Sequence, residues 1–91
     1  MELAGLPGAD LIEEGIRDLR RGVESVPALL VSIGHPRLRQ LFDDLPPPVA
    51  DSPEHRLYER LSRSDPARAH SAYNALIRRL VSFERAAECA R

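Results

Sequence analysis

The chain has 91 residues, of which 43% are hydrophobic and 30% charged, and its formal net charge at pH 7 is −1. This length suits one domain over residues 1–91. The small net charge gives no long-range field for nucleic acid or anionic lipid, and no apolar segment approaches the ~20 residues that span a bilayer. These features argue against a membrane protein and make nucleic acid a less favoured partner.

The composition also indicates where the protein acts. Cys89 is the only cysteine, which excludes an internal disulfide and fits a reducing compartment. The opening residues "MELAGLPGADLIEEG" are acidic, unlike a signal peptide. We therefore expect a cytoplasmic protein. All 13 residues counted as Lys or Arg are arginine, and this bacterial-like bias indicates codon usage in a GC-rich genome.

The first predicted helix covers residues 9–21. Five apolar residues with helical spacing share one of its faces, namely Leu11, Ile12, Ile16, Leu19 and Val23. Gly15 lies within that face, although a glycine inside a helix costs about 1 kcal/mol relative to alanine. We therefore expect another helix to approach closely at Gly15.

Two further helices are predicted at residues 25–33 and 36–45. Ser25 can cap the earlier one, and Gly34 is a natural C-terminal stop. The later one has an apolar stripe with helical spacing, formed by Leu38, Leu41, Phe42 and Leu45. The proline-rich segment 46–52 follows, and we interpret it as an extended spacer.

The last two predicted helices cover residues 53–63 and 66–90. Pro53 and Pro66 stand at the positions where a first helical turn accepts proline, after possible caps at Ser52 and Asp65. The fifth helix is the longest, and its apolar stripe covers about half of its circumference. The sequence therefore predicts an all-α protein, a compact bundle of four to five helices around a long C-terminal helix.

Several polar residues border the apolar stripe of the long helix. His70 and Asn74 are four residues apart, so their side chains can form a hydrogen bond. Glu84 falls almost inside the stripe, and a carboxylate in that position needs a cationic partner. We expect an arginine from another helix to pair with it, and we interpret this border as structural.

The preferred functional hypothesis is a small non-enzymatic protein-interaction subunit, such as an inhibitor, an antitoxin-like partner or an accessory subunit. The short helices are expected to leave the C-terminal part of the long helix bare, so that it binds another protein, a second copy of the chain, or both. The arginine-rich outer face suits partners that carry carboxylates. The predicted partner-binding residues are Leu76, Arg79, Leu80, Phe83 and Ala87.

The alternative hypothesis is a DNA-binding regulator. Residues 25–45 have the outline of a helix-turn-helix, and the second helix opens with Arg37, Arg39 and Gln40, which are base-reading residue types. The acidic pair Asp43–Asp44 and the absence of a basic surface oppose this alternative. No catalytic, metal-binding or cofactor-binding residues are predicted, because no convergent set with the spacing of such sites is present.

Overall fold

The computed structural model describes residues 5–90, and every regular element in that range is an α-helix. In chain order the helices are α1 (Ala9–Arg20), α2 (Val26–Ile33), α3 (His35–Leu38), α4 (Pro53–Ser64) and α5 (Ala69–Ala90). The predicted all-α bundle with a long C-terminal helix is therefore confirmed.

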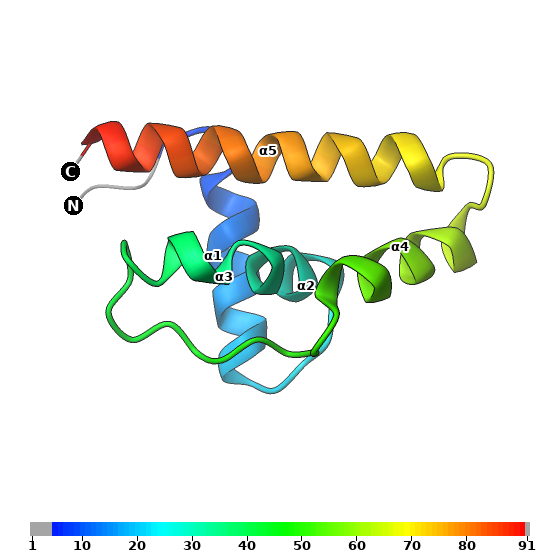
Figure 1. The fold of residues 1–91 in the computed structure, drawn as a ribbon, viewed down its shortest axis with the longest axis horizontal. Coiled ribbons are helices and arrows are strands. Elements are labelled where there is room, and N and C mark those ends of the chain that lie inside the picture. The colour runs from blue at the N-terminus through cyan, green and yellow to red at the C-terminus, as the bar shows by residue number, and fades with distance from the viewer. Residues whose placement is uncertain (1–4, 91) are drawn as a thin grey trace.

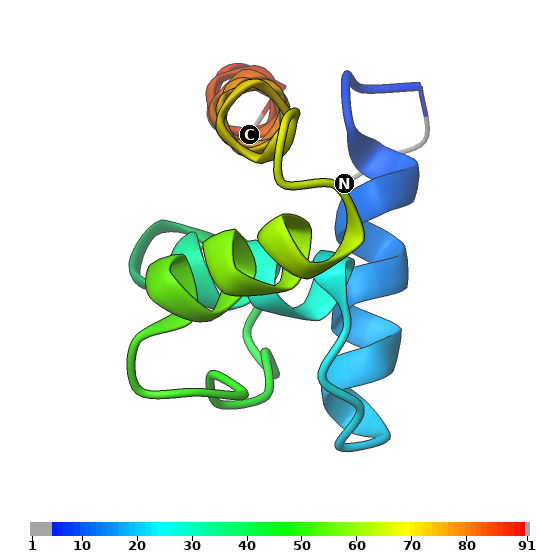
Figure 2. The ribbon, with the colours of Figure 1, turned by 90° about the vertical axis from the view of Figure 1, so that its right-hand side faces the viewer.

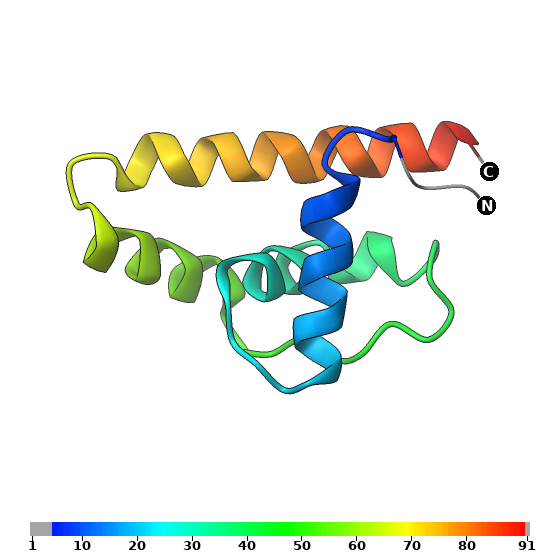
Figure 3. The same ribbon diagram turned by 180° about the vertical axis from the view of Figure 1, so that it is seen from behind.

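The helices pack as an antiparallel hairpin set against a crossed pair. In Figure 1, α5 runs along one edge and α4 returns beneath its N-terminal half. Seen from behind in Figure 3, α1 crosses the direction of α5. Figure 2 shows α1 on the side of the molecule opposite to the segment that links α3 with α4. Helix α2 contacts each of the other four helices.

The most completely buried segment belongs to α2. Four consecutive residues there, from Ala28 to Val31, are all 0% exposed. A helix can bury its whole circumference only when neighbours surround it, which explains why the sequence of α2 is apolar on every side. The short helix α2 is thus the centre of the core, and α5 closes one side of it.

The crossing of α1 and α2 depends on Gly15. A Cβ atom at this position would collide with the carbonyl oxygen of Pro27 and would lie 2.5 Å from Cγ2 of Val31. The backbones therefore approach closely enough that only hydrogen fits between them, and the close approach predicted at Gly15 is confirmed. The cap predicted at Ser25 is also present, because the Ala28 N–H donates to its hydroxyl oxygen at 3.2 Å.

Two predicted helices are shorter than expected. The third ends at Leu38 rather than at residue 45, and the chain continues in turns. The prolines after Leu45 restrict only the residue before them, so they do not account for the stop at Leu38. From residue 39 onward the apolar side chains of Leu41 and Phe42 pack on the core from turns. The fifth begins at Ala69 rather than Pro66, because residues 66–68 form a turn after Asp65.

The segment 46–52 is fastened to the core at two points. The ring Nε2 of His35 donates to the carbonyl oxygen of Pro46 at 3.1 Å. The buried Ser32 hydroxyl donates to the Ala28 carbonyl oxygen at 2.8 Å and accepts from the Val49 N–H at 3.0 Å. The segment links α3 to α4 without helix or strand, and these bonds to α2 and α3 make it part of the surface beside them as well.

Candidate functional site: an apolar face between α2 and α5

The predicted partner-binding surface on α5 is mostly buried inside the chain. Leu80, Phe83 and Ala87 are 3%, 1% and 0% exposed, and Leu76 is half-buried. Arg79 is exposed, but its guanidinium lies 3.5 Å from the carboxylate of Asp10. The expectation that this section of α5 stays bare is wrong.

The start of α1 and the region around α3 cover that section instead. Gly8 lies so close to α5 that a Cβ atom there would be 3.1 Å from the carbonyl oxygen of Arg79. The ring of Phe42 stacks on Phe83 with a centroid distance of 6.4 Å. Phe42 follows the shortened third helix, so the turns that replace the end of that helix provide part of the cover.

The residues proposed for DNA recognition do not lie on a recognition helix. Helix α3 has four residues, and Arg39 and Gln40 lie in the turn after it. Arg37 bonds to two carboxylates of α5, so its guanidinium is already engaged. The geometry gives the DNA-binding alternative no support.

Arg37 joins α3 to α5 through an ion cluster. Its Nη1 donates to Oε1 of Glu84 at 3.2 Å, and its Nη2 donates to Oε1 of Glu88 at 2.5 Å. The Glu84 side chain is only 4% exposed, whereas that of Arg37 is 45% exposed. Burial raises the pKa of Glu84 above 4.5, and the charge of Arg37 opposes that rise. The predicted arginine partner of Glu84 is thus confirmed.

The other polar residues on the border of α5 are at the surface. The Nδ2 of Asn74 lies 3.3 Å from Nε2 of His70, so the expected contact between these side chains is present, but His70 is exposed. On α4, the exposed His55 lies 3.4 Å from the carboxylate of its helical neighbour Glu59. Within residues 5–90, no group of three or more His, Cys, Asp or Glu side chains could hold a metal ion.

An open apolar pocket lies where the end of α2 meets α5. Its volume is about 280 Å³, and its walls are mainly the half-buried side chains of Ile33, Ile77 and Val81 with the exposed ring of Pro36. Arg37 and Glu84 close one end. A second pocket of about 250 Å³ shares Ile33 and Pro36 and continues to Ala50, Asp51 and Glu54.

Ile33 and Pro36 therefore form a ridge between two adjoining pockets. We call the ridge and both pockets the Ile33–Pro36 face. Sequence reasoning missed this face, although Ile77 and Val81 do widen the apolar stripe of α5. The other sequence signal was Ile33, an apolar residue at the end of α2 that is half-buried although the preceding residues 28–32 are buried.

Two arginines border this face on α5. Arg78 and Arg85 lie one helical turn before and one after Val81, and both are exposed. Neither forms an ion pair with a carboxylate of residues 5–90. The face thus combines apolar walls with two cations that are available to a partner.

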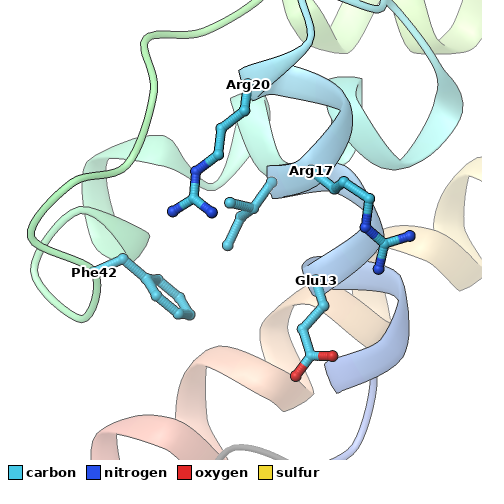
Figure 4. A pocket seen from close by; sticks show the side chains of 5 residues that line it. Glu13, Arg17, Arg20 and Phe42 are labelled. Atoms are coloured by element: carbon cyan, nitrogen blue, oxygen red, sulfur yellow. The ribbon is translucent and has the colours of Figure 1, made fainter.

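Figure 4 shows a further pocket, between α1 and the turns after α3. Its volume is about 300 Å³, and Glu13, Ile16, Arg17, Arg20 and Phe42 line it. Arg20 is 3.2 Å from the carboxylate of Asp44, and Glu13 adds a negative charge to the same walls. This mixture favours no single class of ligand.

Comparison of the chain with models of protein families, with curated proteins and with solved structures finds no match. Among the described residues, no helix has both the length and the apolar character that crossing a membrane requires. The candidate site consequently depends on the geometry of the Ile33–Pro36 face alone.

Proposed function

We propose that the protein is a small non-enzymatic protein-interaction subunit whose binding surface is the Ile33–Pro36 face. The observation that carries this proposal is the pair of adjoining apolar pockets, which the chain's own helices leave open, beside the free cations of Arg78 and Arg85. Apolar surface next to arginine is the composition that distinguishes the centres of protein interfaces.

The charge on the α5 side defines the chemistry of the partner. An occupant that places apolar side chains in the pocket of Ile33, Ile77 and Val81 brings its neighbouring residues next to Arg78 and Arg85. Arginine recognises carboxylates through paired hydrogen bonds. The partner segment therefore carries aspartate or glutamate beside its apolar residues, and a short apolar groove bordered by charge is the way an amphipathic segment is commonly bound.

Selection from a library of random 16-residue peptides displayed on phage tests the proposal. Selection against the immobilised chain should enrich peptides that combine leucine, isoleucine or phenylalanine with aspartate or glutamate. For the enriched peptides, Val81→Ser should weaken binding at least about tenfold, because it removes an apolar wall at the centre of the contact.

Tyr58→Ser is the matched control, because Tyr58 is 41% exposed on α4 and does not line the face. It should leave peptide binding unchanged. Enriched peptides that lack carboxylates, or that bind the Val81→Ser variant as tightly as the wild type, would overturn the proposed function.

A further inference from the structure

The Ile33–Pro36 face carries opposite charges on its two sides. By helical spacing, Arg78 and Arg85 lie beside Val81 on α5, whereas Asp51 and Glu54 line the second pocket near the start of α4. All four side chains belong to exposed residues, and none forms an ion pair with another residue in the range 5–90. A basic side, an apolar ridge and an acidic side therefore follow one another across the face.

The folded chain holds both charged sides in place. The basic side lies on one continuous helix, where Arg78 and Arg85 are seven positions apart, which corresponds to about 10 Å along its axis. The acidic side follows the segment that Ser32 fixes through the Val49 N–H, and Pro53 between the two acids is buried. The distance between the basic and the acidic side is thus fixed, because both sides belong to segments that pack on the core.

We propose that the occupant of the face is a second copy of this chain, related to the first by a two-fold axis that passes near Ile33 and Pro36. This inference rests on the proposed function, because it supplies the carboxylate-bearing partner which that function requires. This axis lies in the plane of the face and is perpendicular to the line that joins its basic side to its acidic side. Rotation by 180° about such an axis brings the basic side of each copy opposite the acidic side of the other.

The symmetry makes the contact self-complementary. Each favourable pairing occurs twice, as in any isologous dimer, and the ridge residues meet their own counterparts near the axis. The net charge of −1 per chain means that two copies experience little overall repulsion at neutral pH. The pairing of exposed charges sets the orientation of the two copies, and the apolar ridge and pockets provide the buried centre.

Sedimentation equilibrium of the full-length chain and of two charge-reversal variants tests this inference. The wild type should be a dimer whose dissociation constant increases with salt, since salt screens exposed charges. The double variants Arg78→Glu/Arg85→Glu and Asp51→Arg/Glu54→Arg should each weaken self-association about 100-fold, because each places like charges opposite one another. An equimolar mixture of the two variants should form a heterodimer in which both pairs of sides are complementary, because one variant is acidic on both sides and the other is basic on both sides.

Two further variants separate this contact from a general effect of charge. Arg63→Glu/Arg68→Glu changes the net charge by the same amount as the α5 variant, but both residues lie at the α4–α5 corner, outside the face, and it should dimerise like the wild type. Pro36→Asp places two carboxylates near the axis and should dissociate the dimer. Circular dichroism of each variant verifies that the helices are retained.

Three results would overturn the inference. They are a wild-type chain that stays monomeric at its highest soluble concentration, a mixture that does not recover association, and a control variant that dissociates as strongly as the α5 variant. A monomer that still binds acidic peptides would retain the proposed function and remove the second copy as occupant. The opposite result is a dimer whose variants behave as expected, together with a library from which no peptide is selected. It would confirm a second copy of the chain as the occupant and would contradict general binding of acidic segments.

Discussion

The two halves of α5 share one apolar stripe but have different surroundings. In the C-terminal half, Leu80, Phe83, Glu84 and Ala87 are all buried. In the N-terminal half only Ala69 is buried, whereas Tyr73, Leu76 and Ile77 are half-buried. The apolar stripe runs along both halves, so the difference comes from the elements that cross the helix and not from the stripe itself.

Close backbone approach distinguishes the C-terminal half. Gly8 lies against Arg79 and Phe83, and Gly34 lies where a Cβ atom would be 2.8 Å from Cδ1 of Leu80. The N-terminal half has α4 as its neighbour, and its contacts there include the edge-to-face pair of Tyr58 and Tyr73 with a centroid distance of 5.9 Å. A helix contributes most to stability where other backbones reach it closely enough to exclude water.

The largest effect is expected for Phe83→Ala. This change removes a ring that is 1% exposed and stacked on Phe42, and it should lower the free energy of unfolding by about 3–5 kcal/mol. Urea denaturation followed by circular dichroism measures the change. Leu76→Ala in the half-buried N-terminal half is the paired control and should cost clearly less. Equal costs for the two variants would contradict the difference between the halves.

A smaller and pH-dependent effect is expected for Arg37→Ala. The change leaves the buried carboxylate of Glu84 without its cation and should lower the free energy of unfolding at pH 7. The pKa of Glu84 is raised above 4.5 in the folded chain, so between 4.5 and the raised value the folded state binds more protons than the unfolded state. Stability associated with Glu84 therefore falls as the pH rises through that range, and removal of Arg37 extends the range upward.

Urea denaturation at pH 5 and pH 7 measures this dependence. The cost of Arg37→Ala should be smaller at pH 5, where Glu84 accepts a proton more readily in the variant. The double variant Arg37→Ala/Glu84→Gln contains no carboxylate at position 84 and should lose that difference. The exposed carboxylate of the neighbouring Glu88 loses its bond to Arg37 in both variants, so this loss contributes equally to the two. A cost that is equal at both pH values would show that the charge of Glu84 does not couple to folding.

The smallest effect is expected for His70→Ala, at the start of α5. His70 is exposed, and its contact with Asn74 is a surface hydrogen bond, so the unfolding free energy should change by less than about 0.5 kcal/mol. Thermal denaturation at pH 7 is sufficient to test this. A loss above 1 kcal/mol would mean that the N-terminal half of α5 is more tightly coupled to the core than its exposure indicates.

The sequence predicted the helices well where the signals are local. Pro53 at the start of α4, the Ser25 cap of α2 and the stop at Gly34 each act within one helical turn, and the helix ends lie within one residue of prediction there. The third helix was too long in the prediction because Leu41, Phe42 and Leu45 have helical spacing. Their apolar side chains pack on the core from turns instead, which the spacing cannot distinguish from a helix.

The candidate site was harder to predict than the fold. Periodicity identifies the apolar side of α5, but it does not say which part of that side other elements cover. The sequence predicts that Glu84 pairs with an arginine, because a buried carboxylate needs a cation. It does not predict that this arginine is Arg37, because that pairing depends on the close approach of the backbone at Gly34 to α5. The Ile33–Pro36 face combines residues from α2, α3 and α5 with the segment after α3, and no local pattern connects them.

The two hydrogen bonds of the Ser32 hydroxyl have a consequence for how the molecule opens. They connect the interior of α2 to the Val49 N–H, which belongs to a segment without helix or strand. Local opening of the segment 46–52 would leave the buried oxygen of Ser32 without a donor, so the segment and α2 form one cooperative unit. The Val49 amide should therefore exchange its hydrogen with solvent on the slow timescale of the core helix rather than on that of a loop.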